Sequence, residues 1–268
     1  MKIAVIGQGL FGAIIGDHLE AQGHRVCRID NRTPGSGSKP AACLMKPGWL
    51  SKVPRLTECL ELLDGLYGVE TIQFRVNNLL NQDVFWVNPA KILADGISTS
   101  AYMVESVNGN TIHTKRERVT FDKVIVAAGV WTRTLCPWVP VEPRWGAAFL
   151  WPEHKESVIP PFIDQWAPYK QVVAFQRGDG LWAGDGSALK SIDSDRELSM
   201  LRRCQEKLDI HTQPRILRGQ RPYVGQNTPG HPCWLEQRGD LIVATGGAKN
   251  GTAAAAFCAL TIGEWLGK

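Results

Sequence analysis

Two glycine-rich turns, one near each end of the chain, constrain its fold more than any other feature. The first, Gly7-x-Gly9-x-x-Gly12, follows an apolar run at residues 3–6 and precedes apolar residues at helical spacing. The second, from Gly246 to Gly251, follows another apolar run and leads into a small-residue segment. Glycine lets the backbone approach a ligand closely, and the first amides of a helix offer unpaired donors. Two strand–turn–helix units therefore predict two contacts with one bound cofactor.

An acidic residue indicates that this cofactor is a dinucleotide. The helix expected after the first turn stops at Gly23, residues 25–29 are predicted to form a second strand, and Asp30 follows Gly12 by 18 residues. This is close to the spacing of a carboxylate that binds a ribose hydroxyl of a dinucleotide. The alternative is that Asp30 only caps the loop that follows.

The rest of the chain alternates between helical and strand patterns. Helices are predicted over residues 54–66, 89–98 and 194–208, and strands near 74–76, 84–87, 102–107, 111–114, 124–129, 170–184, 215–217 and 241–243. The stripe expected on helix 194–208 consists of Leu198, Leu201, Cys204, Gln205 and Leu208. Residues 31–52 are predicted to form an ordered functional loop. Residues 139–172 are rich in proline and tryptophan and show no helical period, which indicates a shift to another structural unit.

Composition limits the class of protein. With 268 residues and 44% hydrophobic content, the chain can form one large domain or two interleaved ones. The net charge of +4 permits an anionic partner without requiring one.

Seven scattered cysteines without a C-x-x-C pair indicate free thiols in a reducing compartment, so we expect a soluble cytoplasmic protein that does not associate with membranes. Neither His18 nor His231 has metal-ligand spacing, and we expect no metal site.

Six segments in the same order resemble the FAD-dependent amino-acid oxidase superfamily, the group of D-amino-acid oxidase, glycine oxidase and sarcosine oxidase. The segments are Gly7-x-Gly9-x-x-Gly12 with Asp30, Ala41-Ala42-Cys43-Leu44-Met45-Lys46-Pro47 (similar to A-A-G-M-L-A-P), residues 86–93 at a helix start, residues 124–132 (V-I-V-A-A-G-V-W-T), Gly219-Gln220-Arg221-Pro222 (similar to G-x-R-P), and residues 244–256 (similar to A-T-G-H-x-R-N-G). The resemblance is weak between residues 145 and 213. Two departures lie beside the expected flavin: Gly247 stands where the family often has histidine, and Thr252 where it usually has an aliphatic residue.

The resemblance implies an α/β fold. Its parts are a Rossmann-like FAD-binding domain of the glutathione-reductase type and an interleaved, smaller substrate domain with an antiparallel sheet and a helix. We expect the FAD-binding domain to comprise residues 1–72, 84–141 and 214–268, and the substrate domain residues 73–83 and 142–213. The chain is shorter than usual members of the family, and the shortage falls in the substrate half.

The resemblance also implies which residues bind FAD. They are Gly7, Gly9, Leu10, Phe11, Gly12, Asp30, Asn31, Ala41, Ala42, Cys43, Leu44, Met45, Ala128, Gly129, Trp131, Gly246, Gly247, Ala248, Lys249, Asn250, Gly251 and Thr252. Neither Cys43 nor Cys233 sits where related covalent enzymes attach their flavin, so FAD is expected to bind noncovalently.

Three basic residues are the expected catalytic side chains. The fork of Arg221 matches a substrate carboxylate, and the alternative is a structural arginine that bridges strands. Lys249 would place a positive charge at the flavin edge that becomes negative, and a solvent-facing turn lysine is an equal alternative. For Lys46, a position at the loop rim is favoured over a role in the site. Four aromatic residues are weaker candidates to line a substrate cavity: Trp145, Tyr169, Trp182 and Tyr223.

Three functions remain open from the sequence. The first is a glycine oxidase-like oxidoreductase that acts on the C–N bond of an amino acid or secondary amine, with hydride transfer from the alpha carbon to flavin N5. The second is a related flavoenzyme that acts on an amino-acid adduct of a nucleobase, with nucleic acid as partner, as in tRNA modification or phage DNA thymidine hypermodification. The shortened substrate half and the basic residues Arg215, Arg218 and Arg221 motivate it. The third is a non-catalytic flavin-binding subunit.

Overall fold

A parallel sheet forms the first layer of the protein. The computed structural model describes residues 1–31, 36–77, 80–93, 99–100, 103–155, 159–167, 170–186, 189–225 and 232–267. The sheet has the order β16-β17-β10-β1-β2-β6. Its strands are β1 (Lys2–Ile6), β2 (Arg25–Ile29), β6 (Thr99–Ser100), β10 (Lys123–Val126), β16 (Trp234–Arg238) and β17 (Leu241–Thr245). All neighbours are parallel except β16 and β17. With helix α1 (Leu10–Ala21) between β1 and β2, the predicted βαβ opening is confirmed.

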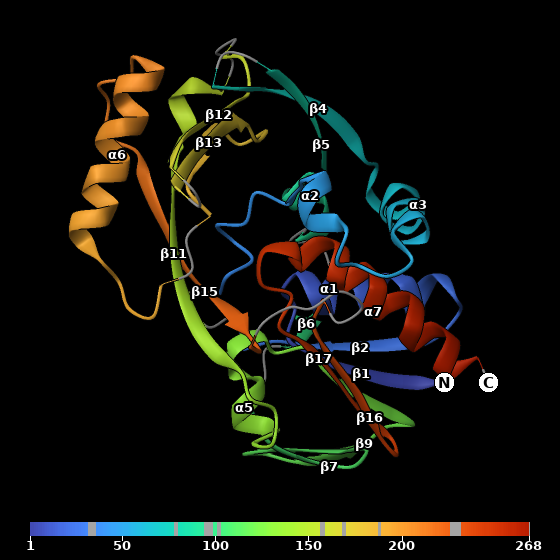
Figure 1. The fold of residues 1–268 in the computed structure, drawn as a ribbon. Helices are drawn as coiled ribbons and strands as arrows, with labels where there is room; N and C mark the ends of the chain where they lie inside the picture. Colours follow the sequence, from blue (N-terminus) through green and yellow to red (C-terminus); the bar gives the residue numbers. More distant parts are fainter. Residues whose placement is uncertain are drawn as a thin grey trace.

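Both faces of this sheet are covered (Figure 1). Helices α1 and α7 (Gly251–Leu266) pack on one face, helix α3 (Leu56–Tyr67) packs against α7, and a small sheet covers the other face. That small sheet consists of β7 (Val104–Asn108), β8 (Thr111–Thr114) and β9 (Arg118–Thr120). Along β1, Ile3 and Val5 join the helix-side core, whereas Ala4 and Ile6 join the core on the opposite side. Burial on both faces explains the unbroken apolar run at the start of the chain.

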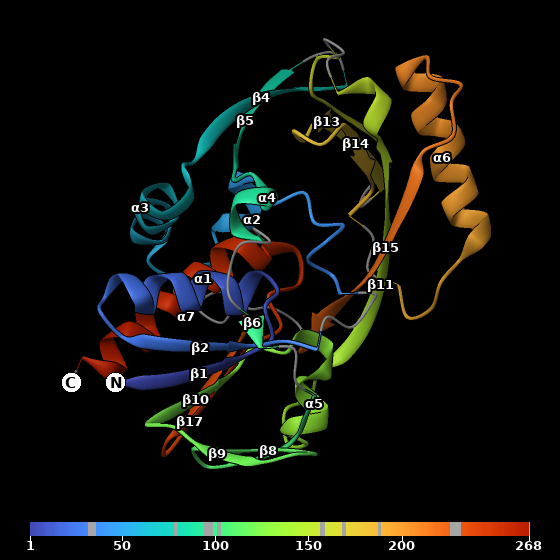
Figure 2. The same ribbon diagram turned by 180° about the vertical axis from the view of Figure 1, so that it is seen from behind.

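An eight-stranded sheet arches over the first layer. Its order is β15-β11-β14-β13-β12-β4-β5-β3. The strands are β3 (Leu44–Met45), β4 (Glu70–Val76), β5 (Leu80–Trp86), β11 (Glu142–Trp151), β12 (Phe162–Ala167), β13 (Lys170–Gln176), β14 (Leu181–Gly184) and β15 (Arg215–Tyr223). Helix α6 (Ser194–Leu208) packs on its outer face (Figure 2). The pair β4 and β12 is parallel, so the sheet is mixed, although the sequence predicts an antiparallel one.

Short helices and 3-10 turns lie between the longer elements. They are α2 (Pro47–Leu50), α4 (Pro89–Ile92), α5 (Thr132–Leu135) and the 3-10 turns η1 (Gly129–Trp131), η2 (Pro152–His154) and η3 (Ala248–Asn250). The helix predicted over 89–98 begins as α4 and reaches Ile92, and residues 94–98 lie outside the described residues. Tyr102, at the start of the predicted hairpin, also lies outside them, but its strands β7 and β8 pair as expected.

The middle of the chain differs most from the sequence-based expectation. Residues 139–172, which show no period, contain the long strand β11 and strand β12. Helix α6 has the predicted bounds, but its buried stripe includes Met200, and the predicted Leu198 is 46% exposed. The helix packs on the sheet through Met200, Leu201 and Cys204, which join Phe149 in one core cluster.

The expected division into two domains stays a prediction. Strands β4 and β15 fall partly or wholly in ranges assigned to the FAD-binding domain, yet both belong to the eight-stranded sheet. A division of the chain by sheet would therefore assign β4 and β15 to the substrate domain. Among the helices that the structure describes, none has the length and apolar character needed to cross a membrane.

Candidate active site

A cavity of about 540 Å³ lies between the two large sheets. One side is formed by the carboxyl ends of β1, β10 and β17, where Gly7, Ala128 and Thr245 line the space. The other side is formed by β13, β14 and β15, which contribute Trp182 and Arg221 among others. The carboxyl ends of parallel strands are the usual place for ligands in open α/β sheets.

Most residues predicted to bind the cofactor line this single cavity. They are Gly7, Gly9, Leu10, Phe11, Asp30, Asn31, Ala41, Ala42, Cys43, Leu44, Ala128, Gly129, Trp131, Gly247, Ala248, Lys249, Gly251 and Thr252. Four others lie outside its lining: Gly12, Met45, Gly246 and Asn250. Met45 belongs to the hydrophobic core. Gly246 has φ +86°, and a Cβ there would lie 2.4 Å from the Val224 side chain.

The first turn is held by close packing and two hydrogen bonds. Gly7 has φ +95°, and a Cβ on it would lie 2.5 Å from the Ala127 carbonyl oxygen. The Gln8 amide donates to Asp30 Oδ2 at 2.6 Å, and the Leu10 amide donates to Ser38 Oγ at 3.0 Å. Asp30 and Ser38 therefore lie directly at the start of α1, where the helix dipole favours negative charge.

Side chains from the second sheet hold part of the loop predicted over residues 31–52, of which residues 32–35 lie outside the described residues. The Trp182 indole donates to the Pro40 carbonyl at 3.1 Å, and Trp86 donates to the Ala42 carbonyl at 3.0 Å. Arg177, which is ion-paired with Asp179 at 2.5 Å, donates to the Lys39 carbonyl at 3.2 Å. These donors satisfy backbone carbonyls of a loop that runs between the two sheets.

The close approach of this loop to β15 requires a glycine. A Cβ on Gly219 would lie 2.7 Å from Pro40 Cγ and 2.8 Å from the Ser36 carbonyl oxygen. Ser36 also forms a bridge with Gln220 of β15. The first glycine of the Gly219-Gln220-Arg221-Pro222 segment therefore brings loop and strand together beside Arg221.

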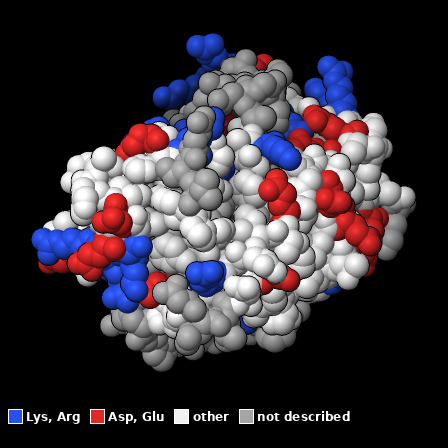
Figure 3. Space-filling view, turned by 90° about the horizontal axis from the view of Figure 1, so that it is seen from above, with Lys and Arg blue, Asp and Glu red and all other residues white. Residues whose placement is uncertain are grey.

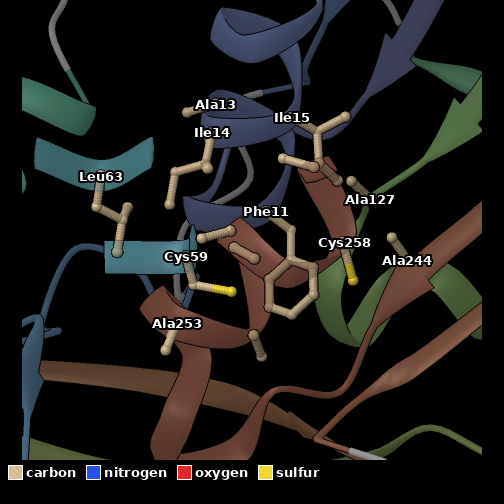
Figure 4. Packing of buried hydrophobic residues seen from close by; sticks show 14 of the residues in the cluster. Phe11, Ala13, Ile14, Ile15, Cys59, Leu63, Ala127, Ala244, Ala253 and Cys258 are labelled. Atoms are coloured by element: carbon tan, nitrogen blue, oxygen red, sulfur yellow. The ribbon is translucent and has the colours of Figure 1, made fainter. Parts of the chain in front are cut away.

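The closing turn packs against the first turn through Phe11. In Figure 4 the Phe11 ring points from α1 toward α7. A Cβ on Gly247 would lie 2.9 Å from two atoms of this ring and 2.8 Å from Gly251 Cα. The Phe11 ring therefore occupies the space beside Gly247 that a side chain would need. Related proteins are expected to carry histidine at this position.

Replacing Gly247 with alanine is expected to lower the free energy of unfolding by about 1–3 kcal/mol, because the new methyl group overpacks this contact. The double variant with Phe11→Leu should lose less than the sum of the two single changes, by about 0.5 kcal/mol or more. Urea unfolding of the four proteins measures this coupling. Strict additivity would show that the ring is not what excludes a side chain at this position.

Cys43 contacts the start of helix α7. Its backbone is left-handed, with φ +54°, at the position where the similar family segment has glycine. Burial raises the pKa of the Cys43 thiol to about 11, against a weaker opposing hydrogen bond with Thr252. The thiol is therefore protonated at neutral pH and a poor nucleophile. Cys233, the other cysteine considered for flavin attachment, contacts Cys258 at 3.3 Å and does not line the cavity.

All three predicted catalytic side chains line the cavity, but in different environments. Arg221 is partly buried on β15 and donates to the Gly186 carbonyl at 2.8 Å. Burial lowers the pKa of Arg221, and Asp185 acts in the opposite direction. The side chain of Lys249 is exposed and faces the cavity, where desolvation lowers its pKa and the charge of Arg221 lowers it further.

Lys46 is buried in the cavity, so the position at the loop rim that the sequence favours is wrong. Its exposed fraction is 7%, and its Nζ donates to Gln171 Oε1 on β13 at 3.2 Å. Burial lowers the pKa of Lys46 to about 8, and the positive charge of Lys249 contributes to that shift. The residue after strand β3 thus presents an ammonium inside the cavity.

Sequence reasoning missed several residues of the lining. Ser38 and Gln171 contribute polar groups that no motif in the sequence marked, and Gln220 is the unassigned position of the Gly219-Gln220-Arg221-Pro222 segment. Of the four aromatic candidates, Trp182 lines the cavity, whereas Trp145 lines a separate small hollow. Tyr223 stacks under the Arg144 guanidinium outside the cavity lining. The fourth, Tyr169, lies outside the described residues.

Solved structures with the same fold were found among amine-oxidising enzymes. Iminodiacetate oxidase from Chelativorans sp. BNC1 matches with a TM-score of 0.73 at 17% identity, over 99% of this chain and 95% of that chain. Glycine oxidase from Geobacillus kaustophilus matches with 0.69 at 14% identity, over 98% and 93%. L-proline dehydrogenase from P. horikoshii matches with 0.68 at 15% identity, over 99% and 92%. The agreement over nearly the whole chain confirms the predicted α/β fold.

The family is established by sequence. No curated protein is significantly similar to the chain. The family model described as "DAO: FAD dependent oxidoreductase" matches residues 94–265, which is more than half of the chain. That range includes β10, β17 and the closing turn of the cavity. The chain therefore belongs to the DAO family of FAD-dependent oxidoreductases.

Proposed function

We propose that this protein oxidises the C–N bond of a free amino acid or secondary amine, with FAD bound noncovalently in the cavity. The observation that carries the proposal is that one cavity joins the first glycine turn, the closing turn and Arg221. In this proposal, the dinucleotide and the arginine that would bind the substrate carboxylate share one space. Glycine oxidase and iminodiacetate oxidase, whose folds match, act on amines that bear carboxylates.

The residues of the cavity fit FAD. The backbone at Gly7 and Gly9 with the start of α1 would hold the pyrophosphate, and Asp30 would bind a ribose hydroxyl. The turn from Gly247 to Thr252 would lie against the flavin ring. The protonated thiol of Cys43 supports noncovalent binding, because a covalent link needs a nucleophilic thiolate.

The protein's own groups would orient the substrate and stabilise charge. Bound FAD supplies the hydride acceptor. Arg221, held on one side by the Gly186 carbonyl, would bind the substrate carboxylate and so direct the Cα–H bond. The amino terminus of α7, together with Lys249, supplies positive potential where negative charge develops.

The nucleobase-adduct alternative has less support. Its basic residues do not form one patch: Arg218 is ion-paired with Glu197 at 2.7 Å, and Arg221 lines the cavity. Figure 3 shows basic and acidic residues interspersed on the face it presents. Non-specific nucleic-acid binding needs a continuous basic surface. Nothing among the described residues specifically favours the non-catalytic subunit.

Anaerobic reduction of the FAD-loaded protein tests the proposal. Glycine, sarcosine and a panel of D- and L-amino acids are mixed with the yellow protein, and the visible flavin absorbance is followed. Bleaching by one of these free amines is the expected result. Bleaching only by an aminoacyl nucleoside would favour the second function, and a flavin that no amine reduces would overturn the proposal in favour of the third.

A further inference from the structure

Two cysteine sulfurs are in contact beside the last helix of the chain. Cys233 stands directly before β16, and Cys258 lies in α7. Both are free thiols, and their Sγ atoms are 3.3 Å apart. Because a disulfide bond is about 2.05 Å long, a movement of about 1.3 Å would bring these sulfurs to bonding distance. The fold therefore places a dithiol pair between two segments that are 25 residues apart in the sequence.

A third cysteine of the same core, Cys59 of α3, is a less suitable partner for either sulfur. Its thiol donates to the Pro54 carbonyl at 3.6 Å. In Figure 4 the sulfurs of Cys59 and Cys258 lie on either side of the Phe11 ring. The contact between Cys233 and Cys258 is therefore the one from which a disulfide can form with the least rearrangement.

The two thiols of the pair differ in their exposure to solvent. Cys233 is partly exposed, whereas Cys258 is fully buried. Burial raises the pKa of the Cys258 thiol well above its usual range, and the contact with Cys233 adds to that shift. Oxidation by a small molecule depends on access to the sulfur. Cys233 is therefore the thiol that an oxidant meets first, and Cys258 lies behind it in contact distance.

We propose that Cys233 and Cys258 are a site of reversible oxidation, at which a peroxide converts the two thiols to a disulfide. The Cys233 sulfur attacks one oxygen of hydrogen peroxide, so an S–O bond forms and the O–O bond breaks. The departing hydroxyl takes the thiol proton and leaves as water, and Cys233 becomes a sulfenic acid. The Cys258 sulfur then attacks the Cys233 sulfur, and the second hydroxyl leaves as water with the Cys258 proton. The two thiols lose two electrons in total, and one peroxide becomes two waters.

The disulfide closes a loop of the chain that contains the closing turn of the cavity. Strands β16 and β17, the turn at residues 246–251 and the start of α7 all lie between the two cysteines. Strand β16 is at the edge of its sheet, next to β17, whereas residues 253–256 of α7 are fully buried. The start of β16 is therefore the side that moves, and the start of α7 stays in place. Oxidation thus fastens an edge strand to the core beside the cavity.

Peptide mapping of the peroxide-treated protein tests this assignment. The full chain, loaded with FAD, is treated with hydrogen peroxide, its remaining thiols are alkylated, and it is digested without a reducing agent. Mass spectrometry should find the peptide with Cys233 joined to the peptide with Cys258, and dithiothreitol should separate them again. Two unlinked peptides, or a link that involves Cys59, would overturn the assignment.

Three variants test the order of the two steps. Cys258→Ala should stop the reaction at the sulfenic acid of Cys233, which dimedone then labels. Cys233→Ser changes a partly exposed position, so it keeps the test decisive if the buried change prevents folding, and Cys258 should stay unlabelled in it. Cys27→Ser, at another partly exposed cysteine, is the matched control and should still form the disulfide. Dimedone on Cys258 in the Cys233→Ser protein would contradict the proposed order.

Thermal unfolding measures what the cross-link does to the fold. A disulfide that closes a loop of this length should raise the Tm of the oxidised protein by about 4 °C or more over that of the reduced protein. Cys27→Ser should keep this rise, and Cys233→Ser should abolish it. An unchanged or lower Tm would show that the link does not fasten β16 to α7. No readout requires turnover, so a flavin that no amine reduces would overturn the proposed function and leave this inference standing.

Discussion

Replacing Arg221 with glutamine is expected to lower kcat/KM for the amine substrate by about 10²- to 10⁴-fold. Two charge-assisted hydrogen bonds to the substrate carboxylate contribute about 1.5–3 kcal/mol each, and each 1.4 kcal/mol is a factor of ten. Steady-state kinetics of the FAD-loaded variant measure the loss. The visible flavin spectrum should stay the same, because the residues expected to hold FAD lie on other segments of the cavity.

Arg218 provides the matched control for this change. It lies three residues earlier on the same strand, outside the cavity lining, and is ion-paired with Glu197 at 2.7 Å. Arg218→Gln removes the same charge from β15 and should change kcat/KM by less than about twofold, because Arg218 does not line the cavity. A loss as large as that in Arg221→Gln would assign the effect to the strand and not to carboxylate binding.

Replacing Gly12 with alanine is expected to weaken FAD binding by about 100-fold or more. The new Cβ would lie 1.7 Å from the Gly7 carbonyl oxygen, so the start of α1 and the turn after β1 must move apart. Overpacking of this kind costs about 1–3 kcal/mol, and more when the blocking atom belongs to the backbone. Titration with FAD, followed by quenching of flavin fluorescence, measures the affinity, and thermal unfolding measures the accompanying fall in Tm.

Gly65 of helix α3 is the control for the added methyl group. No atom outside its immediate chain surroundings lies within 4 Å of a Cβ at this exposed helical position. Gly65→Ala should stabilise the protein by about 0.5–1 kcal/mol through helix propensity and leave FAD binding unchanged. Normal FAD affinity in Gly12→Ala would show that the close contact between α1 and the first turn is not needed for the cofactor.

The glycine turns of the proposed cofactor site could be predicted because their signals are local. A tight turn requires glycine at Gly7 because of its positive φ, and the contact between Gly12 and the Gly7 carbonyl requires a second one. These steric demands act within a few residues, so they appear as motifs. The same holds for α6, whose bounds follow from its periodic pattern and from the Asp193 side chain that caps the Arg196 amide.

The substrate half was less predictable because distant partners decide it. Strand β11 has no apolar alternation, and it forms by pairing with β14 and β15, which are far away in the sequence. Leu198 fits a helical stripe, but the docking angle of α6 turns Met200 inward instead. β-strand preference depends strongly on such neighbours, whereas helical periodicity is a property of the segment itself.

The two glycine turns and the strands before them were determined by the sequence alone, and with them the family and the cofactor it implies. Only the tertiary structure decided that Lys46 is buried, that Gln171 meets it, and that Phe11 lies over Gly247. The physical reason is the separation along the chain over which each effect acts. Backbone sterics act between neighbours along the chain and leave a pattern, whereas the charge around a cavity is the sum of groups that only folding brings together.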